Sequence, residues 1–282
     1  MIRPSVGRRG RILWVTVAVG FLALVGVALW IWVRTRPGDG LGHDRFEHSL
    51  AEAPAMASEP TASENAPRDE IVYHSRHNDR MEIALSFDDG PHPRLTPAIL
   101  KILEEYGIKA TFFMVGENVG YYPAAAKAVV EAGHEIANHT FSHRKFGRMT
   151  EEEMRREILS CQDALASVGE NTPRFIRPPE GEMTATMRQV AGNLDFRIIL
   201  WDVDTRDWAH TPPAEISRHI LDTVQAGDII LMHDFIGHDS PTPEALRLVI
   251  PELLARGYRF VTVGELVNGG READAESLPP TD

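Results

Sequence analysis

The chain has 282 residues, 43% hydrophobic and 25% charged, an ordinary composition for a globular protein with room for one large domain or two small ones. Residues 1–36 hold six of the 29 basic side chains and none of the 41 acidic ones, so the remainder carries a net charge of −18. This acidity argues against nucleic acid as a partner, since phosphate binding needs clustered Lys and Arg. The single cysteine, Cys161, excludes an intramolecular disulfide and a cysteine-based zinc site, so any metal must be held by His and carboxylate side chains.

The first predicted element is a membrane-spanning helix. Residues 12–33 carry no charge, and as a helix they would span about 33 Å, enough for a hydrocarbon core of about 30 Å. A cleavable signal peptide is the alternative, but its apolar region is usually shorter and ends in small residues, whereas this run ends in Trp-Ile-Trp-Val. Four arginines precede the span and two follow it, which predicts an uncleaved signal anchor with residues 1–11 in the cytoplasm. The rest of the chain would lie on the outer face of the cell membrane.

The segment after the span is predicted to be a disordered linker over residues 34–70. It is rich in Ala, Pro, Ser, Glu and Gly, and such a composition buries too little apolar surface to offset the entropy lost on ordering. A folded domain is expected over residues 71–268. The remaining residues, 269–282, begin with two glycines and carry several acids, and we expect a flexible acidic tail there.

Within the main domain, short β-branched or aromatic runs alternate with longer amphipathic runs, which predicts repeated β and α units. The expected strands are 81–87, 110–115, 134–138, 174–176, 196–201, 228–232 and 258–263. The expected helices are 94–106, 123–132, 150–168, 183–192, 213–225 and 243–256. Thr150 and Glu153 form a capping box for the third helix, and Cys161 lies on its apolar face, where a core residue is expected rather than a nucleophile. Seven strands with intervening helices predict a barrel-like parallel sheet whose chemistry gathers at the carboxyl ends of the strands.

Polar pairs follow the first and third expected strands. The stretch SFDDGP, residues 86–91, brings Asp88 and Asp89, for which simple turn formation is the alternative explanation. The stretch HTFSH brings His139 and His143, whose spacing places both imidazoles on one face of a helical turn, with unrelated surface histidines as the alternative. Asp89 and the two imidazoles together make a three-ligand metal site that leaves positions open for water and substrate.

Three later strands also end in polar clusters. The stretch RPPEG, residues 177–181, brings Arg177, which can orient a carboxylate through a forked pair; a surface loop arginine is the alternative. The stretches WDVDTRDW and LMHD bring Asp207, Trp208 and His233 to the same predicted rim. His233 alone would be taken for a structural histidine. Five polar clusters at the ends of five strands, however, indicate one shared site.

These five stretches, in this order, resemble the five motifs of the NodB-homology polysaccharide deacetylases, carbohydrate esterase family 4. Supporting stretches are ATFFMVG, residues 110–116, and GHEIANHTFSH, residues 133–143. The resemblance implies a distorted (β/α) barrel of about seven parallel strands and hydrolysis of an N-acetyl group, less often an O-acetyl group, on a sugar polymer. Peptidoglycan is the first expected substrate, because the anchor and linker place the domain against an envelope, and chitin-like polymers or exopolysaccharides are the others.

The resemblance also implies the metal ligands and the base. Asp89, His139 and His143 would bind a divalent metal, usually zinc, with cobalt or another divalent ion as the alternative. Asp88 would be the general base, and Arg177 would hold it in place. These residue types suit the chemistry, because an amide carbonyl is a poor electrophile and a divalent metal both polarises it and lowers the pKa of water.

On the other side of the site, the resemblance implies that His233 is the general acid, oriented by Asp207, and an ordinary histidine pKa suits a proton donor near neutrality. Trp208 and Leu231 match positions that form a groove wall and an apolar acetyl pocket, with core packing as the alternative. The third motif departs from the family pattern at Glu180, where an aromatic residue, commonly Tyr, is usual. The backbone N–H at this position would serve as an oxyanion hole, while the side chain would add a negative charge beside the groove.

Two other functions fit the sequence. The same fold can hydrolyse a non-sugar amide or imide, a hypothesis that Glu180 favours slightly. A non-catalytic envelope-binding protein built on a decayed enzyme is the third hypothesis, and the presence of every expected metal ligand, base and acid argues against it. In each case the membrane would be contacted through residues 12–33.

Overall fold

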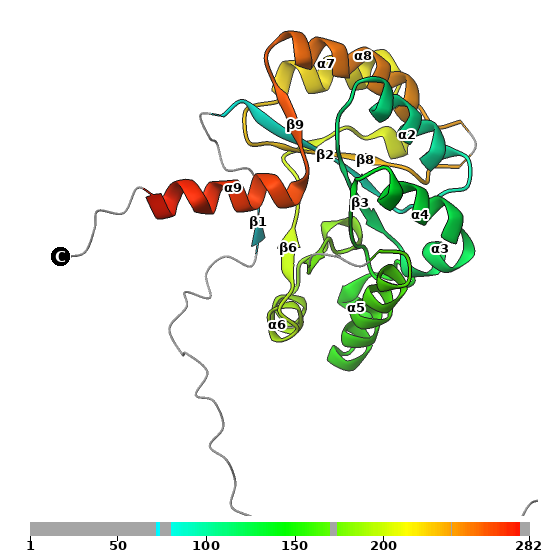
Figure 1. Cartoon of the computed structure of the whole chain (residues 1–282). Coiled ribbons are helices and arrows are strands. Elements are labelled where there is room, and N and C mark those ends of the chain that lie inside the picture. Colours follow the sequence, from blue (N-terminus) through cyan, green and yellow to red (C-terminus); the bar gives the residue numbers. More distant parts are fainter. Residues whose placement is uncertain (1–71, 74–79, 170–173, 238, 277–282) are drawn as a thin grey trace, which may run out of the picture. The chain divides into compact units, whose positions relative to one another are not determined.

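The computed structural model describes residues 72–73, 80–169, 174–237 and 239–276 (Figure 1). The predicted membrane span at 12–33, the basic segment 1–11 and the linker 34–70 lie outside these residues and stay predictions. Among the described helices, none combines the length and the apolar character needed to cross a membrane.

The described strands form one parallel sheet with β2 at its centre. In spatial order the strands are β1 (Val72–Tyr73), β6 (Arg197–Ile199), β5 (Phe175–Ile176), β4 (Glu135–Asn138), β3 (Thr111–Met114), β2 (Glu82–Asp88), β8 (Ile229–His233) and β7 (Val203–Asp204). A further strand, β9 (Arg259–Val261), pairs with the first half of β2. Every pairing is parallel, as predicted. Among the described residues β1 and β7 each pair on one side only, so the predicted barrel is observed as an open half-barrel.

Seven of the strands correspond to the seven that the sequence predicted, and β1 and β7 are additional. Each additional strand has two residues, too few for a period-2 pattern to show in the sequence. Because β7 precedes Asp207, that acid follows β7 rather than the predicted strand at 196–201, which is β6.

The helices cover the outer face of the sheet, except α9, which packs against the inner face (Figure 1). They are α2 (Leu95–Glu105), α3 (Gly116–Tyr121), α4 (Pro123–Glu131), α5 (Glu151–Ala166), α6 (Ala185–Asn193), α7 (Pro213–Thr223), α8 (Thr242–Ala255) and α9 (Val263–Glu276). Neighbouring helices pack in the order α7, α8, α2, α4, α3, α5 and α6. The sequence did not predict α3 or α9. Since α9 continues to Glu276, the predicted domain end at 268 falls inside a helix, while residues 277–282 lie outside the described ranges.

The capping box predicted for α5 is confirmed. The Thr150 hydroxyl accepts from the Glu153 N–H, and the Glu153 carboxylate accepts from the Thr150 N–H. Cys161 lies on the buried face of this helix and is fully buried, which raises the pKa of its thiol to about 12. It is therefore a core residue, as expected, and no thiolate nucleophile.

Alternation of side chains between the two faces of the sheet positions the site. On β2, Ile83, Leu85 and Phe87 pack in the apolar core beneath the helices, whereas Ala84 belongs to a second apolar cluster on the opposite, inner face. Asp88 lies four residues after Ala84 and therefore points to the inner face as well. The outer face of β2 is buried beneath the helices, and the inner face ends in polar residues. Asp88 is the last of these, so it lies beside the cavity.

Helix α9 packs against the inner face of the sheet, nearer to the amino ends of the strands. Its residues Val263, Leu266 and Val267 pack in the same cluster as Ala84 of β2 and Ile229 of β8. The inner face thus carries an apolar cluster packed against α9, while the polar residues of the five motifs gather at the carboxyl ends of the strands.

Candidate active site

The turn after β2 presents the two acids of the first motif. Asp88 is the last residue of β2 and is 3% exposed, and parallel pairing sets its Cα opposite that of His233 on β8. Asp89 follows in a left-handed conformation, with φ of 75°, which turns its side chain away from the path of the strand. A non-glycine residue rarely adopts this conformation, and such strain gathers at functional sites.

The predicted metal ligands meet at the carboxyl ends of β2 and β4. Asp89, His139 and His143 each offer a ligand atom, and these atoms lie within 4.8 Å of one another. Asp89 Oδ1 is 3.3 Å from His139 Nε2 and 3.0 Å from His143 Nε2. This oxygen is buried and accepts no hydrogen bond from the described residues. A buried carboxylate oxygen without a hydrogen bond, facing two imidazole nitrogens, fits a divalent cation of the zinc class.

The predicted helical turn for His139 and His143 is wrong, because the two histidines lie in a loop. Thr140 and His143 are both left-handed, with φ of 66° and 54°. The Thr140 N–H donates to Asn138 Oδ1, and the His143 N–H donates to Thr140 Oγ1. Side chains therefore supply the hydrogen bonds that a helix would take from its backbone, and the loop holds the two imidazole centroids 5.0 Å apart.

The tautomer of His139 is fixed by the third motif. His139 Nδ1 lies 2.7 Å from the carbonyl oxygen of Arg177. Because a carbonyl oxygen only accepts hydrogen bonds, Nδ1 carries the hydrogen and Nε2 presents a lone pair to the site. Histidine ligands of metals are commonly oriented by such a bond through their second nitrogen.

Arg177 is a buried residue and not a surface loop arginine. Its side chain is fully buried, and Nη1 donates to Asp88 Oδ1 at 2.6 Å and to Ser86 Oγ at 2.9 Å. Its other nitrogens donate to the carbonyl oxygens of Ile199 and Leu200 at the end of β6. The expected forked pair with a carboxylate is thus replaced by a single contact to Asp88, because Ser86 and these carbonyls take three of the other four N–H donors. Arg177 holds one oxygen of Asp88 in a fixed position.

Asp207 and His233 form the second buried pair. His233 Nδ1 lies 2.8 Å from Asp207 Oδ1, and the His233 N–H donates to Asp207 Oδ2 at 2.8 Å. Asp207 is fully buried, and it also accepts from the Thr242 hydroxyl and the Trp208 N–H. A carboxylate with four donors is an acceptor, so His233 Nδ1 carries the hydrogen and Nε2 remains for a substrate.

The protonation of His233 follows from this pairing. Burial alone would lower the pKa of the imidazole, but the hydrogen bond and the charge of Asp207, aided by the charges of Asp88 and Asp89, raise it to about 9. At neutral pH His233 is therefore protonated and can donate a proton. The neighbouring carboxylate of Asp89 likewise raises the pKa of His143, against the opposing effect of burial.

The predicted site residues share one cavity of about 470 Å³. It is lined by Asp88, Asp89, His139, His143, Glu180, Trp201, Asp204, Trp208, Leu231 and His233. Eight of the ten predicted site residues are in this set, and the other two, Arg177 and Asp207, lie behind Asp88 and His233. Trp208 is 49% exposed, so core packing does not explain it, whereas Leu231 is 4% exposed.

Sequence reasoning missed two lining residues, Trp201 and Asp204. Both belong to the stretch WDVDTRDW that supplied Asp207 and Trp208, so the signal was present in a polar segment already singled out. Asp204 was passed over because the short strand β7, which carries it to the rim, was not predicted.

Glu180 lies at the edge of the cavity with a left-handed backbone, φ 56°. Its carboxylate is 2.6 Å from Lys145 Nζ, and both side chains are more than half exposed. The negative charge expected beside the groove is therefore paired with a cation from the loop that follows His143.

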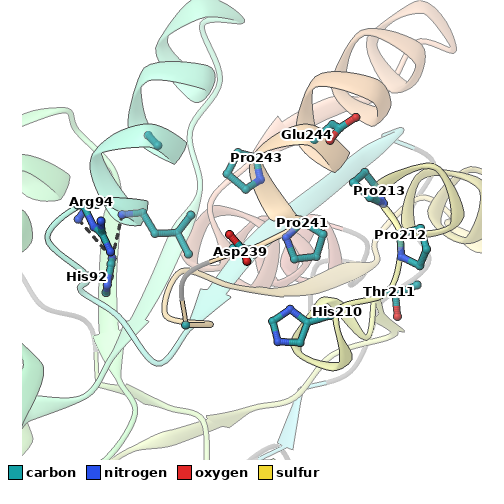
Figure 2. A pocket seen from close by; sticks show the side chains of 14 residues that line it. His92, Arg94, His210, Thr211, Pro212, Pro213, Asp239, Pro241, Pro243 and Glu244 are labelled. Atoms are coloured by element: carbon teal, nitrogen blue, oxygen red, sulfur yellow. Dashed lines mark hydrogen bonds between the residues drawn. The ribbon is translucent and has the colours of Figure 1, made fainter.

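A second cavity, of about 670 Å³, opens on loops of the same rim (Figure 2). Figure 2 shows His92 and Arg94 on one side of it and His210 with the segment 211–213 on the other. None of the ten predicted site residues lines it. His92 Nδ1 accepts from the backbone N–H of Leu95 at 3.0 Å and from that of Arg94 at 3.3 Å, so this histidine caps the amino end of α2.

The chain is similar to known proteins in sequence and in fold. The family model for polysaccharide deacetylase matches residues 75–199. A peptidoglycan-N-acetylglucosamine deacetylase of Bacillus cereus is 37% identical over 194 residues, which are 68% of this chain and 70% of the relative. The chain belongs to the polysaccharide deacetylase family. The predicted family, the NodB-homology polysaccharide deacetylases of carbohydrate esterase family 4, is thereby confirmed.

Solved structures of family members match the fold. A peptidoglycan N-acetylglucosamine deacetylase in complex with 4-naphthalen-1-yl-N-oxidanyl-benzamide is 34% identical, with a TM-score of 0.68 over 71% of this chain and 94% of that one. A family 4 acetyl xylan esterase from Clostridium thermocellum, in complex with a cobalt ion, is 36% identical, with a TM-score of 0.62 over 66% of this chain and 90% of that one. The polysaccharide deacetylase fold of this chain therefore occurs in proteins named for different acetylated polymers.

Proposed function

We propose that the chain is a metal-dependent hydrolase that removes N-acetyl groups from aminosugars of a polysaccharide, with peptidoglycan as the first substrate. The observation that carries the proposal is the placement of Asp88 and His233 as register partners on adjacent strands, in the cavity that Asp89 also lines. A proton acceptor and a proton donor are then available to one bound acetamide.

A divalent metal, zinc in the first place, would be held by Asp89, His139 and His143. The orphaned Asp89 oxygen and the lone pair of His139 Nε2 support this donor set. When bound there, such a cation would polarise the acetamide carbonyl and lower the pKa of a water molecule. The similar acetyl xylan esterase in complex with a cobalt ion supports a divalent metal and does not distinguish zinc from cobalt.

The proton steps would be carried out by two buried pairs. Asp88, fixed through one oxygen by Arg177, has its second oxygen available to accept the proton of the attacking water. His233 would donate its Nε2 proton to the departing amine, which leaves badly as an anion. Asp207 would keep the ring of His233 oriented and favour the charged form before the transfer.

Binding of the substrate would use the exposed parts of the cavity. Trp208 offers an exposed aromatic face on which a sugar can pack, and the buried Leu231 offers an apolar contact for the acetyl methyl. The neighbouring pair of Glu180 and Lys145 adds one charge of each sign at the edge. Peptidoglycan is placed first because the similar proteins above include two named for it, and chitin-like polymers or exopolysaccharides are the alternatives.

The test is acetate release from metal-loaded protein offered peptidoglycan, chitooligosaccharide and acetylated xylan. We expect release from at least one N-acetylated polymer, loss of release on chelation and recovery with zinc or cobalt. Asp88→Asn should reduce the rate by about 10²–10⁴-fold, the usual contribution of general base catalysis. Its metal content should equal that of the unaltered chain.

The other functions predict different results in the same assay. A hydrolase of non-sugar amides or imides would release no acetate from the polymers but would turn over small amides. A non-catalytic envelope-binding protein would bind polymer equally well with Asp88 or Asn at this position, and would turn over neither class of substrate.

We also propose that the enzyme is a single-pass protein of the cell membrane, anchored through residues 12–33 with its catalytic domain outside. The apolar length of the segment and its missing cleavage site support this. In cells, the full chain should sediment with membranes, and protease added outside should remove the catalytic domain. Recovery of a shortened chain in the medium would instead indicate a cleaved signal peptide.

A further inference from the structure

Asp234 is a buried acid that the proposed proton steps do not use. It directly follows His233 and is fully buried. His233 lines the cavity, whereas the Asp234 side chain reaches the first turn of α2, where its Oδ2 accepts from the Thr96 hydroxyl at 2.5 Å. Its backbone N–H donates to the carbonyl oxygen of Asp88 at 3.1 Å. Asp234 thus joins the end of β8 to both sides of the turn that follows β2.

The carboxylate of Asp234 lies directly against Gly90, the residue after Asp89. A Cβ at position 90 would be 2.1 Å from Asp234 Oδ1, far inside van der Waals contact. The turn that carries Asp89 therefore runs over the carboxylate with no side chain between them. Only glycine permits this approach at position 90.

A chain of hydrogen bonds continues from Asp234 to the far end of the same turn. Thr96, which donates to Asp234, accepts from the backbone N–H of His92 at 2.8 Å. On the near side, Asn118 Nδ2 donates to the carbonyl oxygen of Asp89 at 2.7 Å. The residues from Asp89 to His92 are therefore held by side chains before and after Gly90.

Keeping an acid in this position is unfavourable for folding alone. Asp234 Oδ1 is buried without a hydrogen bond from the described residues, and an unsatisfied buried polar atom costs about 1–3 kcal/mol. Burial, together with the charges of Asp89 and Asp88, raises the pKa of Asp234 to about 7, against the opposing hydrogen bonds from the Thr96 side chain and the Gly90 backbone. Because the buried acid destabilises the folded state, we expect its role in the adjacent site and not in folding.

We infer that Asp234 is a positioning residue for the metal site: through Gly90 and Thr96 it fixes the turn that presents Asp89 to His139 and His143. The inference rests on the proposed function, in which Asp89 binds a divalent cation. Carboxylates behind metal ligands commonly set the orientation of those ligands.

The molecule contains a matched control at the opposite, amino-terminal ends of the strands. Glu135, at the start of β4, accepts from the Thr111 hydroxyl at 2.7 Å and lies against Gly264, where a Cβ would be 2.2 Å from Glu135 Oε1. This cluster contains the same three residue types as the Asp234 cluster, namely an acid, a threonine and a glycine. This cluster stands at the amino ends of β3 and β4, whereas the predicted metal ligands stand at the carboxyl ends of β2 and β4, so it reports on stability without the metal site.

The test measures cobalt affinity by competition with a chromophoric chelator in the full chain, together with Tm. Asp234→Ala should weaken cobalt binding by about 10–100-fold, the usual effect of removing a group behind a metal ligand. Asp234→Asn keeps the shape and an acceptor for Thr96, and it should recover most of the affinity. Glu135→Ala should lower Tm and leave the cobalt affinity of the folded protein unchanged.

A second pair of variants tests the path through Thr96 and keeps the inference falsifiable should Asp234→Ala not fold. Thr96→Val removes the donor and should weaken cobalt binding, whereas Thr96→Ser keeps the hydroxyl and should not. In the Asp234 variants and in the Thr96 variants, kcat should fall when the metal affinity falls. Saturating these variants with cobalt should recover part of the lost kcat.

Two outcomes would overturn the inference in distinguishable ways. If Asp234→Ala and Thr96→Val lowered Tm as Glu135→Ala does but bound cobalt like the unaltered chain, Asp234 would be a structural residue only, with the proposed function intact. If the unaltered chain bound neither cobalt nor zinc, the proposed metal site would fail first and the inference with it.

Discussion

Asp88 and His233 face each other across the backbone pairing of β2 and β8, where the parallel register sets their Cα atoms opposite one another. Each has a buried partner behind it, Arg177 for Asp88 and Asp207 for His233. The proposed base and acid are thus held by strand pairing in the centre of the sheet, where neither depends on a loop for its position. If both residues serve one reaction, the effects of substituting them on kcat should depend on each other.

The first prediction concerns this link. Asp88→Asn and His233→Ala should each lower kcat by about 10²–10⁴-fold. The double variant should be far less impaired than the product of the two, because groups that act as a unit are not additive in their effects. Thr150→Ala, in the cap of α5 and remote from the cavity, is the control and should combine additively with either. Full additivity of the first pair would contradict the proposal that the two residues work together in one turnover.

Removing the buried cation behind Asp88 should destabilise the fold. Arg177→Met leaves Asp88 buried without its partner, which should lower the free energy of unfolding by about 3–5 kcal/mol in urea denaturation. Arg247→Met removes an exposed arginine that pairs with Glu105 and should cost at most about 1 kcal/mol. Equal losses in the two variants would contradict a special role for the burial of Arg177.

The pH dependence of activity should report His233. Since the pKa of His233 is raised to about 9, its proton is present at neutral pH, and kcat/KM should fall as the pH rises through about 9. The same shift stabilises the folded state fully below the ordinary histidine pKa of 6.5, and this contribution is lost as the pH approaches 9. Asp207→Asn removes the charge that raises the pKa, so the alkaline limb of the profile should move to lower pH. A limb that stays in place would assign it to another group.

Metal binding should appear as stability without any substrate. Zinc at about one hundred times its dissociation constant should raise the free energy of unfolding by about 2.7 kcal/mol. His143→Ala removes one ligand and should abolish most of this gain, whereas His219→Ala, an exposed histidine on α7, should keep it. Equal gains in both variants would place the ion elsewhere. Calorimetry with and without chelator measures the difference.

The charged pair at the cavity edge should affect substrate choice more than catalysis. Glu180→Gln frees the Lys145 cation, so kcat/KM for anionic peptidoglycan fragments should rise relative to that for neutral chitooligosaccharides. Stability should change by less than about 1 kcal/mol, because exposed ion pairs contribute little. The ratio of the two substrates is the measurement, and an unchanged ratio would remove Glu180 from recognition.

The sequence predicted the repeating elements well because their signals are local. The capping box of Thr150 and Glu153 and the apolar stripe of α5 are visible over sixteen residues and were confirmed. Helix α9 was missed because the glycines at 269 and 270 looked like the start of a tail, and the apolar contacts of Val263 and Leu266 that support the helix come from distant strands. The turn expected for His139 and His143 was wrong for a similar reason, since that loop is set by backbone N–H groups that donate to the side chains of Thr140 and Asn138.

By itself the sequence determined the family, the parallel β and α order, and the identity of the metal-binding and proton-transfer candidates, because these depend on residue types in motifs that stay contiguous along the chain. Only the tertiary structure decided how they meet. The strand register sets Asp88 beside His233, and the end of β5 delivers Arg177 to Asp88 and its carbonyl to His139. Asp234 against Gly90 is the clearest case, because no sequence spacing reveals that a carboxylate from one motif occupies the space left by a glycine in another.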